Sequence, residues 1–438
     1  MKILLKNIFI ISPGSHHHLT KKDVLIHEHT IVRISSPNSI TDAAAEIIDG
    51  SALQVSTGWF DLHVNFREPG NEYKEDLQSG SLAALKGGFT GVLMMPSTEP
   101  PLSDRTKVEY IIQRSKTFPI NIVPAGTVSA GHLGKDVSEM YDMFQAGVHV
   151  FTDDKKPIED SGLLIRALQY SNHFGGRIFS YCHDKSIAAS GMINESVQSA
   201  SLGLKGIPSV AEEVMVATHL FLAEYTGAPL HFSTITTSGS VQLIREAKAK
   251  GLKVTADVAA IYLMLSDDEL SGFDTNLKLL PPLRSKADQQ ALIQGLADGT
   301  IDCICSDHQP EDIENKKKEF ALAADGASGI ETAFAVARTV LIDKLSIPEL
   351  ISKFTSRPRC IAGLKVGLIE EGHEADLTVF DSEKKWTVQS SDILSKSKNN
   401  PFLGKELTGK PIVVINKGFA WTLSSLKATS DFSSLQGK

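Results

Sequence analysis

The sequence predicts an α/β protein, a (β/α)8 TIM barrel that carries a small β-sandwich domain built from both chain ends. Three observations predict it: strand-like runs alternate with helical periods in the middle of the chain, β-rich runs fill the two ends, and polar residues follow several of the strand-like runs. The expected domains are residues 55–363 for the barrel and residues 1–54 with 364–438 for the β domain.

The two chain ends have the same β-rich texture. The first carries KILLKNIFII, DVLIHEHTIVRI and AEIIDG, and the second carries EADLTVFD, WTVQ and KPIVVINKGFAWTL. Short strands need neighbours to bury their apolar faces. We therefore expect the two ends to pair into one domain.

The middle of the chain contains repeated strand-helix units. The strand-like runs are TGVLMMP, INIVPAGT, GVHVFTDD, RIFSYCHD, PLHFSTIT, LKVTADV and DCICSDH, and segments such as SGLLIRALQYSNHF have apolar residues at i, i+3 and i+4. So many units favour a closed barrel over an open sheet, and they place any chemistry at the carboxyl ends of the strands. The polar residues expected there are His63, Ser97, Asp153, Asp154, His183, Thr234, Asp307 and His308.

Composition narrows the function classes. Of 438 residues, 42% are hydrophobic and 22% are charged, which is typical of a globular protein and not of a disordered or fibrous one. A net charge of -8 without a long basic run makes nucleic acid an unexpected partner. The sequence has no apolar stretch long enough for a membrane helix. Its four cysteines lie in apolar stretches and lack paired spacing, so we expect reduced core residues in a cytoplasmic protein.

The segment GWFDLHVNFREPG, residues 58–70, is the most informative motif. A His-x-His pair at a strand end would point both imidazoles to one face and bind a metal from two sides. Here His63 stands at the first position and Asn65 at the second. The sequence therefore predicts a weakened metal site at this strand end.

Motifs along the whole chain resemble those of the dihydroorotase family of the amidohydrolase superfamily. They include GWFDLHVNFREPG, YKEDLQSGSLAALKGGFTGVLMMPSTEPP, FTDDKKP, GLKGIPSVAEE, KLLPPLRSKAD, DGTIDCICSDHQP, GASGIETA and SKSKNNPFLGKELTGK. The resemblance implies an amidohydrolase-type barrel and the reversible conversion of carbamoyl aspartate to dihydroorotate. It also implies zinc, which polarises the ring carbonyl and holds a hydroxide, and a carboxylate that moves the proton.

The resemblance assigns metal-ligand positions to this chain. His63 matches the first histidine, Asp154 the bridging carboxylate, and Asp307 the metal-bound aspartate that also serves as general acid/base. The three other imidazole positions are lost, because they hold Asn65, Tyr181 and Thr234. An amide, a phenol and a hydroxyl are poor zinc donors, so we expect no cofactor, or at most weakly held zinc.

Substrate-contacting positions have also changed. Arg67 is kept and could bind a substrate carboxylate through two hydrogen bonds, and Ser97 stands where the family has an asparagine. Leu280 replaces a second asparagine, and Glu311 replaces a histidine. A carboxylate at position 311 would repel an anionic substrate.

Two neighbouring histidines could rebuild a shifted site. His183 shares the face of Tyr181 but lies about 6.5 Å further along the strand, and His231 is expected to face away from Thr234 and pack under a helix. His308 is expected to orient Asp307 by a hydrogen bond. Residues 309–325 match a mobile loop of the family and are expected to be solvated here.

Three hypotheses stay open. The first is a noncatalytic dihydroorotase-like protein that acts as a scaffold for aspartate carbamoyltransferase, as some members of the family do, and that forms a homodimer. The second is an active dihydroorotase or related cyclic amidohydrolase with a rearranged metal centre. The third is a sensor that binds a small anion through Arg67 in the barrel mouth. The loss of three imidazoles favours the first.

Overall fold

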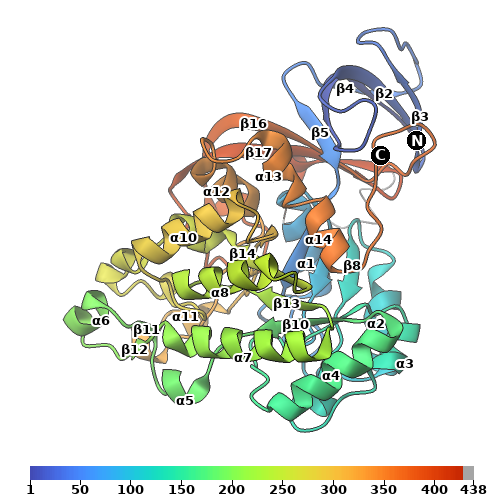
Figure 1. The fold of residues 1–438 in the computed structure, drawn as a ribbon. Helices are drawn as coiled ribbons and strands as arrows, with labels where there is room; N and C mark the ends of the chain where they lie inside the picture. The colour runs from blue at the N-terminus through green and yellow to red at the C-terminus, as the bar shows by residue number, and fades with distance from the viewer. Residues whose placement is uncertain (428–438) are drawn as a thin grey trace.

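The computed structural model describes residues 1–427 of the chain, and eight parallel strands lie at its centre (Figure 1). Those strands are β6 (Trp59–Val64), β7 (Phe89–Met94), β8 (Asn121–Pro124), β9 (Val150–Phe151), β10 (Arg177–Tyr181), β13 (Leu230–Ser233), β14 (Val254–Ala259) and β15 (Cys303–Cys305). They form one three-stranded and one five-stranded sheet. Two parallel bridges, Val64 to His308 and Gly126 to Phe151, join the sheets edge to edge. The predicted (β/α)8 barrel is confirmed.

Helices follow the barrel strands and surround them. Their bounds are α1 (Leu77–Lys86), α2 (Arg105–Ser115), α3 (Met140–Gln145), α4 (Ser161–Phe174), α7 (Val210–Thr226), α8 (Ser238–Ala249), α9 (Ala260–Met264), α10 (Lys286–Ala297), α11 (Ile313–Lys316), α12 (Ala333–Val340), α13 (Ile347–Ser352) and α14 (Ser356–Ile361). Local sequence fixes α4 well: the Asp160 side chain accepts hydrogen bonds at its start, and Gly175 ends it with φ of 80°. Within residues 1–427, no helix combines the length and the apolar character needed to cross a membrane.

A small insertion interrupts the strand-helix alternation after β10. It contains α5 (Lys185–Ala188), β11 (Ile193–Asn194), α6 (Val197–Leu202) and β12 (Gly206–Ile207), and its two strands pair in parallel. The residue pattern does not predict this unit, because each of its elements is too short to show a period.

Strands from both chain ends form one sheet apart from the barrel (Figure 1, blue and red strands). The sheet contains β1 (Lys2–Ile11), β2 (Lys21–His27), β3 (Thr30–Ser35), β4 (Glu46–Asp49), β5 (Gln54–Thr57), β16 (Leu377–Thr387), β17 (Glu406–Asn416) and β18 (Phe419–Thr422). β5 extends past the boundary expected at residue 54 and lies between β1 and β16. It joins the first chain end to the second. A separate core that includes Ile3, Val24, Val55 and Leu377 fills this domain.

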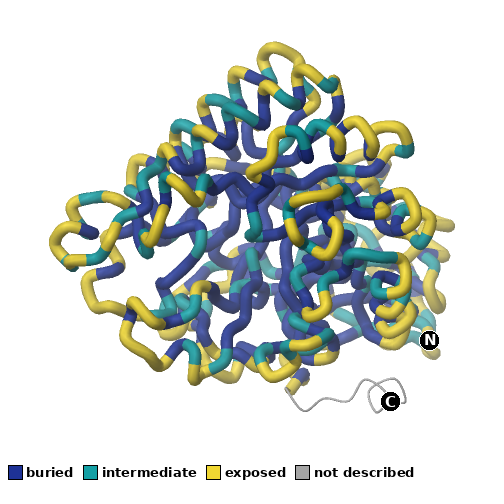
Figure 2. The backbone as a smooth tube through the Cα atoms, turned by 90° about the horizontal axis from the view of Figure 1, so that it is seen from below, coloured by how far each residue is buried: buried dark blue, intermediate teal, exposed yellow. Residues whose placement is uncertain are grey.

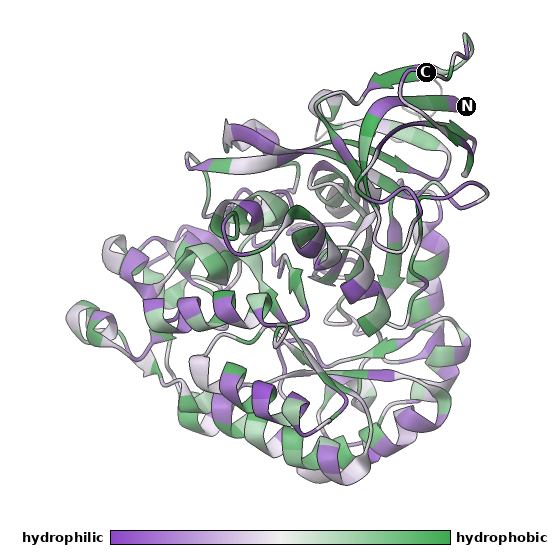
Figure 3. Cartoon of the chain, turned by 45° about the horizontal axis from the view of Figure 1, so that its top comes forward, coloured by the Kyte–Doolittle hydropathy of each residue, from purple (hydrophilic) through white to green (hydrophobic). Residues whose placement is uncertain are grey.

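Most residues of the barrel strands are buried, as the tube coloured by exposure illustrates (Figure 2). At the end of the barrel next to the small sheet, Trp59 packs against Phe334 with ring centroids 4.4 Å apart. The surrounding helices carry both apolar and polar residues (Figure 3), and α4, for example, buries Leu164, Ala167 and Leu168. Burial of these residues holds the strand ends in fixed positions.

The cysteines depart from expectation at one position. Cys182, Cys303 and Cys305 are buried free thiols, but Cys360 on α14 is exposed. α14 lies on the outside of the barrel, where an apolar neighbourhood in sequence does not guarantee burial.

Candidate functional site at the barrel mouth

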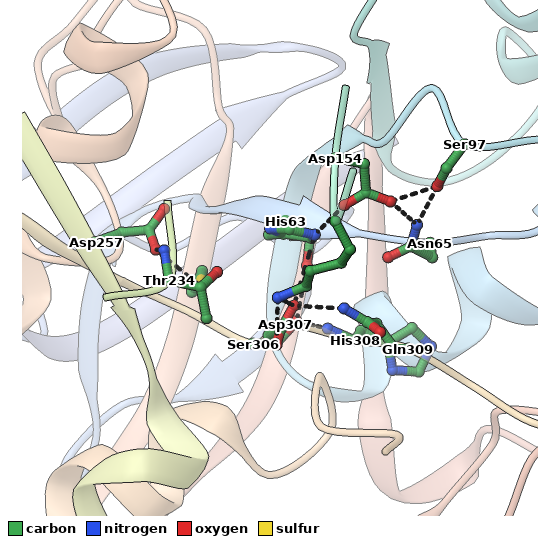
Figure 4. A network of polar contacts seen from close by, with 12 residues as sticks. His63, Asn65, Ser97, Asp154, Thr234, Asp257, Ser306, Asp307, His308 and Gln309 are labelled. Atoms are coloured by element: carbon green, nitrogen blue, oxygen red, sulfur yellow. Dashed lines mark hydrogen bonds and ion pairs between the residues drawn. The ribbon is translucent and has the colours of Figure 1, made fainter. Parts of the chain in front are cut away.

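Three side chains from distant parts of the chain meet at the carboxyl ends of the strands (Figure 4). His63 lies one residue before the end of β6, Asp154 follows β9, and Asp307 follows β15. His63 Nε2 lies 2.8 Å from Asp154 Oδ1 and 3.5 Å from Asp307 Oδ1. The structure therefore brings together the three residues that match metal ligands of the family.

The charges of His63 and Asp154 stabilise one another. Burial by itself would lower the pKa of His63, but the carboxylates of Asp307 and Asp154 together raise it above its ordinary value. Burial by itself would raise the pKa of Asp154, yet His63 and a hydrogen bond from Ser97 hold it below its ordinary value. This pair is an ion pair held inside the protein.

Asn65 takes part in the same network as a hydrogen-bond donor. Its Nδ2 donates to Asp154 Oδ2 at 2.8 Å and lies 2.9 Å from Ser97 Oγ, and Ser97 also donates to Asp154. Asp154 therefore has hydrogen-bond donors where a bridging carboxylate would need free lone pairs for metal. Ser97, expected to contact substrate, lines the adjacent cavity and also belongs to this network.

The two adjacent aspartates have different roles. Asp153 accepts hydrogen bonds from the backbone N–H groups of Val128 and Ser129 and from the Ser129 hydroxyl. It is a structural residue that ties β9 to the loop after β8. Asp154 has φ of 51°, a turn that points its carboxylate toward His63.

Lys155, a residue outside the matched ligand positions, contacts Asp307. Lys155 Nζ lies 3.0 Å from each carboxylate oxygen of Asp307 and 5.0 Å from the centroid of the Tyr181 ring. Gln309 Nε2 donates to Asp307 Oδ1 at 2.9 Å. The residue that matches the general acid/base is thus engaged by a cation and an amide. The available sequence signal is the position of Lys155 directly after Asp154.

Three buried polar atoms lack a hydrogen-bond partner at the positions where imidazoles are lost. They are Asn65 Oδ1, Tyr181 OH and Thr234 Oγ1, on residues exposed by 3% or less. Burial, with nearby Asp307, raises the pKa of Tyr181 well above its ordinary value, so the phenol stays neutral. A neutral phenol and a neutral hydroxyl donate protons more readily than they bind zinc.

The rings of His183 and His308 do not enter this network. The His183 ring stacks on the Tyr181 ring with centroids 6.0 Å apart. Burial and, to a smaller extent, the positive charge of Arg284 lower the pKa of His183. His308 is fully buried and accepts a 3.3 Å hydrogen bond from the Gly329 N–H, so it does not orient Asp307 through its ring.

The prediction that His231 packs under a helix is wrong. His231 Nε2 lies 2.9 Å from Asp257 Oδ2 between neighbouring strands, and Asp257 Oδ1 accepts a hydrogen bond from the Thr234 N–H at 2.6 Å. Thr234 has φ of 55°, so the alternation of side chains that holds within a strand ends before it. The odd offset from His231 to Thr234 therefore does not predict the face of the strand on which His231 lies.

Arg67 is already paired within the chain. Its Nη2 lies 2.9 Å from Glu311 Oε1, and Lys74 Nζ lies 2.7 Å from Glu311 Oε2. Glu311 is 5% exposed. The expectation of a solvated segment over residues 309–325 holds for about half of its positions, which are exposed. Glu311 and Lys316 depart from it, because both are buried and Lys316 donates to the carbonyls of Ala324 and Gly326.

A cavity of about 400 Å³ opens beside these residues. Its lining includes Asn65, Arg67, Ser97, Asp154, Lys155, Leu280 and Glu311. Leu280 contributes an apolar side chain where the family has an amide. The cavity is large enough for a small molecule, but the guanidinium that would receive a carboxylate is bound to Glu311.

The residues present do not fit a zinc ion. Catalytic zinc needs three good protein ligands, whereas His63, Asp154 and Asp307 are bound to one another, to Asn65 and to Lys155. Within the described part of the chain, no group of three or more His, Cys, Asp or Glu side chains has an arrangement suited to a metal ion.

Comparisons with known proteins agree with the motifs. The family described as Dihydro-orotase-like matches residues 54–240, and the Amidohydrolase family matches residues 182–419. The chain is 42% identical over 421 residues to a dihydroorotase of Ruminiclostridium cellulolyticum, covering 95% of this chain and 98% of that protein. It is 41% identical to a dihydroorotase of Trichlorobacter lovleyi, covering 93% and 96%. The chain belongs to the dihydroorotase family.

Solved structures support the fold of this dihydroorotase-family protein. An L-hydantoinase (dihydropyrimidinase) from Arthrobacter aurescens superposes with a TM-score of 0.82 at 24% identity, covering 95% of each chain. A D-hydantoinase (dihydropyrimidinase) from Thermus sp. superposes with a TM-score of 0.82 at 21% identity, covering 98% and 97%. At these identities the likeness concerns the barrel and its β-rich domain.

Proposed function

We propose that this protein is a noncatalytic dihydroorotase-family member of pyrimidine biosynthesis that binds and supports aspartate carbamoyltransferase. The proposal rests on the residues that occupy the metal-ligand positions of the family. Asn65, Tyr181 and Thr234 replace imidazoles, and the remaining ligands His63, Asp154 and Asp307 are satisfied by side chains of the chain itself. Without a metal-bound hydroxide, the hydrolysis of a cyclic amide lacks its nucleophile.

The pairing of Arg67 supports the same proposal. A substrate carboxylate would have to displace Glu311 from Arg67 and Lys74, and it would then face a buried negative charge. Loss of metal donors and loss of anion binding are separate changes. Both reduce turnover, while the barrel and its core stay intact.

The outside of the barrel offers a surface that a partner could cover. Helix α7 exposes Val210, Val214, Phe221 and Tyr225, of which Phe221 is 71% and Tyr225 is 74% exposed. Spacings of four, seven and four residues place them along one side of the helix. Large exposed aromatic residues are typical of protein interfaces.

The test is co-expression with aspartate carbamoyltransferase from the same organism. We expect the two chains to migrate together in size-exclusion chromatography and the transferase to gain activity or stability from the partner. Separate migration with an unchanged transferase would refute the scaffold role. A double variant, Phe221→Ser with Tyr225→Ser, measures whether the exposed stripe of α7 carries the contact.

The enzyme alternative is tested in the same preparation. Purification without chelator, followed by metal analysis and a dihydroorotate assay, is expected to give neither stoichiometric zinc nor turnover. Near-stoichiometric zinc, together with turnover that Asp307→Asn abolishes, would favour an active dihydroorotase with a rearranged centre. Carbamoyl aspartate and dihydroorotate are also titrated calorimetrically, and heat of binding that Arg67→Met removes would favour the small-anion sensor.

A further inference from the structure

One lysine brings a positive charge into the group of residues that match the metal ligands. Lys155 Nζ lies 3.0 Å from both carboxylate oxygens of Asp307, and its side chain is 15% exposed. Its ammonium lies 5.0 Å from the centroid of the Tyr181 ring, at one of the lost imidazole positions. The charge is therefore placed among the former ligand positions and not in the solvent.

The two buried carboxylates of this group carry more negative charge than His63 alone can compensate. The side chains of Asp154 and Asp307 are 4% and 8% exposed, and the single imidazole of His63 contacts both. Two carboxylates that share one site are stable only if a proton or a positive charge compensates them. In an enzyme of this family a metal would provide that charge.

The other cations that line the cavity are engaged elsewhere. Arg67 pairs with Glu311, Lys156 donates to the carbonyl of His132, and Lys185 lies 3.4 Å from Glu159. Besides His63, Lys155 is the cationic side chain that contacts Asp307, and it follows Asp154 directly in the sequence.

We propose that the ammonium of Lys155 supplies, beside His63, the second positive charge of the barrel mouth, and that it excludes a divalent metal from the place bounded by His63, Asp154 and Asp307. An ammonium supplies positive charge and three N–H donors, but it accepts no lone pair and holds no hydroxide. A divalent ion bound to Asp307 would sit next to this ammonium and be repelled by it. The inference concerns the same site as the proposed function, but it does not require aspartate carbamoyltransferase.

The test compares Lys155→Met with Lys156→Met, a neighbouring cavity lysine without a contact to Asp307. Zinc alone is titrated into each protein by calorimetry, and the melting temperature is recorded with and without zinc. We expect Lys155→Met to bind zinc at least 10-fold more tightly than the parent protein or Lys156→Met, and to lose that gain when Asp307→Asn is added. Zinc binding by the parent as tight as by Lys155→Met would overturn the proposal.

A second measurement needs no metal and does not depend on Lys155→Met alone. In a double-variant cycle, Lys155→Met and Asp307→Asn are each expected to lower the melting temperature, and the double variant is expected to lose less than the two shifts added together.

Lys155→Arg keeps the charge and is expected to bind no zinc. Additive shifts, or zinc binding by Lys155→Arg equal to that of Lys155→Met, would refute the role of the ammonium. Comigration with the transferase is scored separately, so either proposal can fail alone.

Discussion

Removing the carboxylate of Glu311 tests the ion cluster that occupies Arg67. Glu311 is 5% exposed, and its two oxygens lie 2.9 Å from Arg67 Nη2 and 2.7 Å from Lys74 Nζ. In Glu311→Ala two cations with side chains 16% exposed are left facing each other. Breaking a buried ion pair costs about 3–5 kcal/mol, and partial access of water to both cations reduces the expected loss to about 2–3 kcal/mol.

The free energy of unfolding is measured by urea titration with circular dichroism. Glu314→Ala, which removes an exposed carboxylate from the same segment, is the matched control and is expected to change stability by less than about 0.5 kcal/mol. A double variant, Lys74→Met with Glu311→Leu, is expected to recover part of the loss, because it removes one of the unpaired cations.

The result that would refute this reasoning is a Glu311→Ala protein as stable as Glu314→Ala. Arg67 and Lys74 would then be solvated well enough to need no partner. Arg67 would be free to receive an anion, and the argument from its pairing with Glu311 would fail. Calorimetric binding of dihydroorotate to the parent protein would point the same way.

Three further predictions concern the packing of the protein interior. Burial lowers the pKa of His219 from 6.5 to about 4. The stability that the neutral imidazole contributes is therefore fully present above pH 6.5 and is lost as the pH falls toward 4. Urea titration is expected to show that the free energy of unfolding falls by about 2 kcal/mol between pH 7 and pH 5. His219→Gln is expected to abolish this fall, whereas His173→Gln, at an exposed histidine, is expected to retain it. An equal fall in all three proteins would contradict the prediction. Gly58→Ala places a Cβ 2.0 Å from two side-chain oxygens and is expected to cost about 3 kcal/mol, whereas Gly272→Ala meets nothing within 4 Å; equal stability of the two variants would contradict the packing argument. Trp59→Ala removes a fully buried ring packed among phenylalanines and is expected to cost about 3–5 kcal/mol, and a loss below about 1 kcal/mol by the same titration would show that the core tolerates its absence.

The sequence determined the barrel and the loss of imidazoles. Periodicity of apolar residues is a local property, so the alternation of strands such as β10 and helices such as α4 could be predicted from short windows. The substitutions at Asn65, Tyr181 and Thr234 were equally visible, because a matched motif fixes each position by its neighbours in the chain. The short elements of residues 185–207 carried no such period.

Only the tertiary structure decided what the remaining side chains contact. Lys155 and Asp307 are 152 residues apart, and Arg67 and Glu311 are 244 apart, so no local pattern connects them. Their meeting depends on how the closed barrel brings the ends of different strands together and on backbone turns such as φ of 61° at Arg67. The alternation of residues along a strand predicts the face from which a side chain projects. The partner of a long flexible side chain depends on which charged groups the folded barrel places within its reach.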